Sequence, residues 1–194
     1  MKFKNCLNKL DESVKTTVQP KTRGELKKII EDTIKEHGFN CDLNFIDTSL
    51  ITNMSELFFG SKFNGDISKW DVSKVKGMKN MFFRSDFNGD ISKWNVSNVK
   101  DMFCMFYNSK FNGDISKWNV SNVKDMEWMF KGSKFNRDIS NWDVSNVENM
   151  KGMFRNSKFA GDISDWDVRH VKYAEDMFKR CPLENKPEFQ PKKD

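Results

Sequence analysis

A 24-residue repeat fills most of this 194-residue chain and constrains its fold more than any other feature. The motif FNGDISKWDVSKVKGMKNMFFRSD occupies residues 63–86. Further copies follow without insertion, and they begin at Phe87, Phe111, Phe135 and Phe159. A fixed period of this length is the signature of architectures in which similar units stack on their neighbours, because no unit can bury its apolar face alone.

A weaker copy precedes these five. Residues 39–51 read FNCDLNFIDTSLI, in which Phe39 and Asp42 match Phe63 and Asp66 after a shift of 24. Terminal repeats are expected to be atypical, since one of their faces has no neighbouring repeat. The array therefore has six 24-residue coils over residues 39–182.

The apolar residues within one coil predict two kinds of local structure. The spacing I-x-x-W-x-V over residues 67–72 is like the L-x-x-L-x-L of a leucine-rich repeat, and it predicts a short parallel strand. The apolar residues of M-x-x-M-F over residues 78–82 lie at i, i+3 and i+4, which predicts a single helical turn. We therefore expect an LRR-like repeat solenoid of six stacked 24-residue coils, each a short parallel strand plus a short helical turn.

The segments on either side of the array have different compositions. Residues 22–38 predict an N-terminal capping helix, because Thr22 and Glu25 form a capping box ahead of an apolar stripe that ends at a glycine. Such a helix would shield the first coil, whose exposed edge otherwise invites aggregation. We expect residues 1–21 to be flexible, and the Pro-rich tail at 183–194 to be disordered.

Charge and cysteine content narrow the classes of function. The net charge is +5, and the excess lies in residues 61–180, with 21 basic against 16 acidic residues. Duplex-binding proteins carry a denser basic stripe, so nucleic acid is only a minor option as a partner. The four cysteines are far apart and form no CxxC pair, which favours reduced thiols over a disulfide framework. No signal peptide, lipobox or apolar run of about 18 residues is present, so we expect an intracellular, cytoplasmic protein without membrane contact.

Residues that could carry catalysis are sparse. The only histidines are His37 and His170, and no Cys/His/Asp group has the spacing of a catalytic or metal site. We therefore expect no enzyme activity, no metal, no cofactor and no small-molecule substrate. The recurring tryptophans lie in an inward pattern, which favours core packing over stacking on nucleic-acid bases.

One aspartate recurs in each coil: Asp42, Asp66, Asp90, Asp114, Asp138 and Asp162. Stacked like charges repel unless each carboxylate is hydrogen-bonded, so we expect each to accept backbone N–H groups in its own turn. Calcium is the alternative, but it requires denser acidic ligands than one aspartate per 24 residues.

The residues FNGDIS-W-VSNV--M--MF resemble the BspA-like leucine-rich-repeat family, in the form described as a mycoplasma lipoprotein repeat. The resemblance covers residues 39–182. It implies a solenoid that serves adhesion or protein binding, and it carries no catalytic residues. The surface members of the family have an export signal, which this chain lacks, so an intracellular protein partner is favoured over a role as a surface adhesin.

Function is expected where the copies differ at outward positions. The candidate partner-binding residues are Phe83, Arg84, Phe103, Tyr107, Trp128 and Lys131. Exposed aromatic rings flanked by cations are typical of binding hot spots, although these rings would also suit packing against one another between coils. A secondary polar face carries Lys69, Lys93 and Lys117, and it would be either a solvated surface or a docking groove.

The sequence favours a non-catalytic protein-binding solenoid module that acts on a macromolecular partner. One alternative is a small intracellular inhibitor of a host machine, such as a phage counter-defence or anti-CRISPR-type factor. A fragment of a surface adhesin is another. Direct binding of nucleic acid through the lysines of the polar face is the minor option. The open ends of a solenoid also permit end-to-end pairing, so the oligomeric state stays open.

Overall fold

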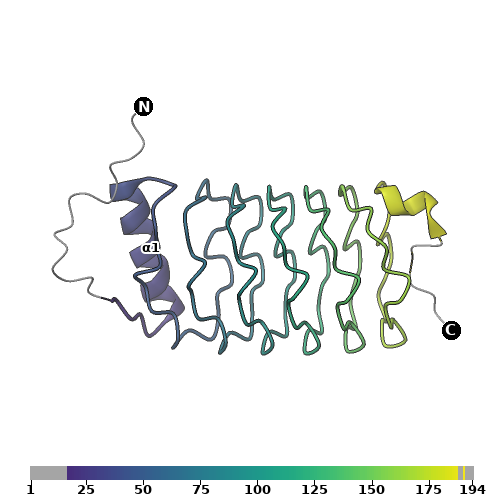
Figure 1. Cartoon of the computed structure of the whole chain (residues 1–194), viewed down its shortest axis with the longest axis horizontal. Helices are drawn as coiled ribbons and strands as arrows, with labels where there is room; N and C mark the ends of the chain where they lie inside the picture. The colour runs from purple at the N-terminus through teal and green to yellow at the C-terminus, as the bar shows by residue number, and fades with distance from the viewer. Residues whose placement is uncertain (1–16, 188–189, 191–194) are drawn as a thin grey trace.

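The computed structural model describes residues 17–187 and residue 190 (Figure 1). The coils follow one another in a single row, with helix α1 (Arg23–His37) at one end and the 3-10 helix η1 (Pro182–Asn185) at the other. The expected flexibility of residues 1–16 and disorder of residues 188–189 and 191–194 lie outside the described residues.

The predicted LRR-like solenoid of strands and helical turns is wrong. Within the described residues no extended strand forms, and the one α-helix lies outside the coils. Neighbouring coils are joined instead by isolated parallel bridges. Most of these bridges link one recurring position, which is occupied by Asn53, Gly77, Asp101, Asp125, Asn149 and Tyr173. The 24-residue units are therefore stacked coils built of turns. We number them coil 1 (39–62), coil 2 (63–86), coil 3 (87–110), coil 4 (111–134), coil 5 (135–158) and coil 6 (159–182).

Residues 67–72 form a turn instead of the predicted strand. The backbone N–H of Trp70 donates to the carbonyl of Ile67 at 3.2 Å. Just before it, the carboxylate of Asp66 accepts from the N–H of Ser68 at 2.8 Å. These local bonds use amides that a parallel ladder would need, so the I-x-x-W-x-V pattern marks inward positions without making a strand.

Residues 78–85 form two consecutive turns instead of the predicted helical turn. Each turn is closed by a backbone bond between residues three apart, of 3.1–3.2 Å. Asn80 (φ 56) and Arg84 (φ 52) have left-handed backbone, which a right-handed helix does not contain. The N–H of Asn80 consequently donates to the carbonyl of Phe103 in the next coil, at 2.9 Å. Apolar spacing at i, i+3 and i+4 fits these turns as well as a helix, and the bonds between coils favour the turns.

The core lies inside the coils, at the recurring apolar positions that the sequence marks as inward. In coils 2–5 these phenylalanine, isoleucine, tryptophan, valine and methionine side chains are at most 4% exposed. Each tryptophan donates its indole N–H to a carbonyl of the preceding coil; Trp118, for example, bonds to Ile91 at 3.0 Å. The interpretation of the tryptophans as core residues is confirmed.

Side-chain ladders hold the turns. The carboxylate of Asp90 accepts from the N–H of Ser92 at 2.9 Å, and hydrogen bonds from Ser92 hold the pKa of Asp90 below its usual range. The same bond recurs at each aspartate of the series, which confirms the turn interpretation. Asparagines form a second ladder, in which the N–H of Asn112 donates to Oδ1 of Asn88 at 2.7 Å. Among the residues that the structure describes, no group of three or more His, Cys, Asp or Glu side chains could hold a metal ion.

The N-terminal end is covered by α1, at the position that the sequence predicts. Thr22 caps the helix by accepting from the N–H of Glu25 at 3.2 Å. Leu26 and Ile30 are buried in the common core. Ahead of the helix, Val18 forms a parallel bridge with coil 1, so part of the segment expected to be flexible lies against the stack.

The tail begins with η1, although we expected it to be disordered from residue 183. Leu183 is fully buried and lies 24 residues after Phe159, so it takes the phenylalanine position of a further repeat. The side-chain amide of Gln190 donates to the carbonyl of Leu183 at 2.6 Å. No helix in the described part of the chain is long and apolar enough to cross a lipid bilayer.

Candidate functional site

Aromatic side chains at one outward position of successive coils stack into a ladder. The rings of Phe59 and Phe83 lie 4.7 Å apart and nearly parallel, and those of Phe83 and Tyr107 lie 4.6 Å apart. This spacing is close to the ~4.8 Å that separates hydrogen-bonded neighbouring chains. The bonds between coils thus hold equal positions in register and bring the rings face to face. We call Phe59, Phe83 and Tyr107 the outer ladder.

Two further rings adjoin the outer ladder. Trp128 lies 6.4 Å from Tyr107 and 6.0 Å from Phe103, in tilted arrangements. The structure therefore brings together all four aromatic residues that the sequence singles out. We define the aromatic patch as Phe59, Phe83, Phe103, Tyr107 and Trp128.

The basic residues predicted at this site lie over the rings. Lys131 Nζ is 4.5 Å from the ring centre of Trp128 and 5.2 Å from that of Tyr107. The guanidinium of Arg84 lies 5.4 Å from the ring centre of Phe83. A cation over a free ring face contributes about 0.5–1 kcal/mol at an exposed site. The rings do pack on one another, and Phe83, Phe103, Tyr107 and Trp128 are partly exposed.

Three cations lie over the patch. Lys79, which lies 4.7 Å from the ring centre of Phe103, is the third. Within the described residues, no ion pair joins Lys79, Arg84 or Lys131 to a carboxylate. The carboxylates of Glu127 and Asp125 also lie near the patch, since they act on the thiol of Cys104 together with Lys131 and Lys79.

The orientation of the rings limits what the patch can bind. Both faces of Phe83 are covered, one by Phe59 and the other by Tyr107. Stacked rings present their edges outward, and ring edges carry partial positive charge. The ladder is therefore not a platform for planar bases, which stack on free ring faces. It suits carboxylates, carbonyl oxygens and apolar side chains.

Trp128 has an unusual backbone for a bulky residue. Its φ of 55 is left-handed, a conformation that costs non-glycine residues of the order of 1–2 kcal/mol. The indole lies against Gly152 of the next coil, where an added Cβ would be 2.6 Å from Trp128 Cδ1. The equivalent residue of every other coil is also left-handed, so the repeat imposes this backbone on Trp128.

The cysteine next to the patch is not a reactive group. Cys104 precedes Trp128 by one repeat and is 2% exposed. Burial, with a smaller contribution from Glu127, raises the pKa of its thiol to about 12. A thiol that keeps its proton at neutral pH is a poor nucleophile. Cys41 and Cys181 are also buried.

The secondary polar face is separate from the patch. Lys69, Lys93 and Lys117 are exposed, one in each of coils 2, 3 and 4. No hydrogen bond, ion pair or ring contact within the described residues joins them to the aromatic patch.

Two residues of the site were missed by reasoning from the sequence. Phe59 is 52% exposed and belongs to the degenerate first copy, where the repeat is hardest to recognise. A shift of 24 places it in line with Phe83, so the signal was present. Lys79 lies 24 residues before Phe103, and only the register of the coils places its ammonium over that ring.

Comparison with known proteins gives one match. A family model described as "Mycoplasma protein of unknown function, DUF285" matches residues 25–134 and, in a second overlapping hit, residues 107–189. No curated protein and no solved structure matches the chain.

Proposed function

The chain belongs to this Mycoplasma family of unknown function, and we propose that it is a non-catalytic protein-binding module whose aromatic patch contacts an acidic protein surface. The sequence motif further leads us to infer kinship with BspA-like repeat proteins. This kinship concerns the repeat motif and the binding role.

The three cations at the aromatic patch carry the proposal. They lie at four of its five rings and have no ion-pair partner among the described residues. Elsewhere on the stack, Arg155 and Lys179 pair with Asp176, and Lys172 pairs with Glu148. Rings with flanking cations are the residue types that dominate binding hot spots. A partner that offers carboxylates beside apolar side chains would complement both components.

The test compares partner capture by two matched variants. Affinity purification from the native host with the wild-type chain, followed by mass spectrometry, identifies the partner, which is then purified for binding measurements. The double variant Tyr107→Ala and Trp128→Ala removes the centre of the patch, and Lys117→Ala changes an exposed lysine of the polar face. Truncation of a hot-spot residue costs about 2 kcal/mol or more, so we expect the affinity of the double variant to fall at least ~30-fold. The Lys117 variant should bind like the wild type.

Two further measurements make the result decisive. Circular dichroism and thermal unfolding must show that the double variant keeps the fold. Affinity should fall with added salt, since the cations of the patch face acidic groups. Unchanged binding by a folded double variant would exclude the patch as the site. Loss of binding in the Lys117 variant alone would move the site to the polar face, and a nucleic acid as the captured partner would refute the proposal.

A further inference from the structure

One row of bonds between coils runs in a single direction, while other residues, such as Lys172, donate back to the preceding coil. In each coil, N–H groups of alternate residues donate to carbonyls of the following coil. In coil 5, Gly152 donates to Glu175 at 2.9 Å and Phe154 donates to Met177 at 3.0 Å. Every inner coil thus presents a row of donors toward the C-terminal end of the stack.

Within residues 17–187 and residue 190, no coil follows coil 6 to accept these bonds. Among the described residues, the N–H groups of Ala174, Asp176 and Phe178 have no acceptor. The next donor of the row, the N–H of Arg180, is satisfied by the carboxylate of Glu184 at 2.8 Å. Three aligned donors therefore remain at this end, in the arrangement that binds an added chain segment through its backbone.

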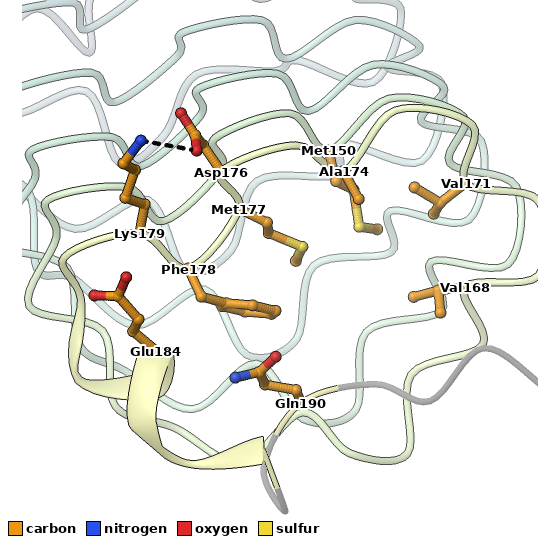
Figure 2. A pocket seen from close by; sticks show the side chains of 10 residues that line it. All are labelled: Met150, Val168, Val171, Ala174, Asp176, Met177, Phe178, Lys179, Glu184 and Gln190. Atoms are coloured by element: carbon orange, nitrogen blue, oxygen red, sulfur yellow. Dashed lines mark ion pairs between the residues drawn. The ribbon is translucent and has the colours of Figure 1, made fainter.

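A cavity with an apolar floor and a polar rim lies beside the open row. It has a volume of about 500 Å³; its apolar lining includes Met150, Val171, Ala174, Met177 and Phe178, and its polar lining is Asp176, Lys179, Glu184 and Gln190 (Figure 2). Ala174 stands where each of the other five coils has methionine. The missing methionine side chain leaves Met150 of coil 5 in the wall of the cavity, so there is room for an apolar side chain from outside.

We propose that this end of the stack is a second docking site, which binds an extended segment of a partner protein. The segment supplies carbonyls at alternate residues to Ala174, Asp176 and Phe178, and it places one large apolar side chain in the cavity beside Ala174. The site is independent of the aromatic patch. The backbone hydrogen bonds of the added segment provide affinity, and the cavity selects which side chain the segment carries at that position.

A second folded copy stacked head to tail is excluded as the occupant. The acceptor end of a second copy is coil 1, which α1 covers; Leu26 and Ile30 are buried there, and Arg23 Nε bonds to the carbonyl of Ser55 at 2.5 Å. A segment with free carbonyls satisfies the row, and a partner's extended chain provides them.

A synthetic peptide serves as the probe. The sequence NMKGMFRNS, residues 149–157, accepts the equivalent bonds inside the chain: Asn149 from Met126 and Met153 from Phe130, both at 2.9 Å. Amide exchange of the full-length protein is followed by NMR as this peptide is added. We expect the amides of Ala174 and Phe178 to exchange at least ~tenfold more slowly at saturation. The amide of Phe154, which is already bonded, should not change and serves as the internal reference.

Matched variants separate the backbone contact from the cavity. Ala174→Met restores the residue of the other coils, so the fold should be kept while the cavity is filled and the peptide affinity falls at least ~tenfold. A peptide carrying M153D and F154D should not bind, and Tyr107→Ala in the protein should leave peptide binding unchanged.

Three outcomes would overturn the proposal: no protection of these amides by the peptide, equal peptide affinity of the folded Ala174→Met variant, or protection that rises with the concentration of the protein alone. The last would assign this end to self-association.

Discussion

Replacing the buried Trp118 with phenylalanine tests whether tryptophan–carbonyl bonds between coils stabilise the stack. Trp118 is 3% exposed, and its indole N–H donates to the carbonyl of Ile91 at 3.0 Å. That carbonyl also accepts from the backbone N–H of Trp94, so it keeps one bond in the variant. The lost hydrogen bond therefore costs its ordinary net value, about 1 kcal/mol.

The smaller ring adds a packing cost. Phenylalanine is roughly 40 Å³ smaller than tryptophan, and at about 24 cal/mol per Å³ of cavity this costs about 1 kcal/mol. We expect Trp118→Phe to lower the free energy of unfolding by about 2 kcal/mol in total. For a chain of this size the midpoint of thermal unfolding should fall by about 4–8 °C. Circular dichroism during heating, and urea titration, measure both quantities.

Trp128→Phe is the matched control. This indole is partly exposed, and its N–H makes no hydrogen bond within the described residues, so its loss should change stability by no more than about 0.5 kcal/mol. Incorporation of benzothienylalanine at Trp118, which keeps the shape but lacks the N–H, should lose only the hydrogen-bond share of about 1 kcal/mol. Equal stabilities of the two phenylalanine variants would refute the reasoning.

Four further predictions concern glycines and ionisable groups. Gly24→Ala, in the first turn of α1, should raise stability by about 0.5 kcal/mol in urea titration, because alanine is the better helix former. Gly132→Ala should lower it by about 1–2 kcal/mol, since Gly132 has a φ of 67 and a Cβ there would overlap a neighbouring asparagine side chain. Burial raises the pKa of Cys104 to about 12 from the ordinary 9.0. Above pH 9 the thiol of the unfolded chain loses a proton that the folded chain keeps, so the free energy of unfolding should fall as the pH rises. A Cys104→Ala variant with the same pH dependence would contradict this. Hydrogen bonds from Ser116 lower the pKa of Asp114, so its contribution is present above the ordinary pKa of 3.8 and lost as the pH falls below it. Asp114→Asn, which cannot ionise, should be less stable than the wild type at pH 7 and should lose less stability than the wild type between pH 4 and pH 2.

The candidate site shows which inferences a repeat sequence supports. Phe83, Tyr107 and Trp128 were identified from the variation among copies, and the structure brings them together. Their contacts follow from the period of 24 alone, since equal positions of neighbouring coils become neighbours in space. Phe59 and Lys79 obey the same rule, and a strict column-by-column comparison of the six copies would have found them.

The apolar spacing did not predict the backbone conformation within each coil, because that conformation depends on bonds within the coil and on bonds between coils. Each coil has two residues with left-handed backbone, four positions apart; in coil 2 they are Asn80 and Arg84. The second of these positions is held by glycine or asparagine in four of the six coils (Gly60, Asn108, Gly132 and Asn156), which is the residue preference of left-handed backbone. The first position includes Cys104 and Trp128, which do not share that preference, so the apolar spacing dominated and predicted a helical turn.

The sequence by itself determined the number of coils, the inward residues, the aspartate-held turns and the helix that covers the first coil, because each of these follows from spacing and local chemistry. The tertiary structure decided the path of the backbone. Amides of alternate residues donate to the next coil, which excludes a helical turn, and the local turns with left-handed residues exclude a continuous strand. The tertiary structure also decided what is left exposed at the end. Only the direction of those bonds shows that coil 6 keeps three open donors at Ala174, Asp176 and Phe178 among the described residues, beside a cavity where one methionine is missing.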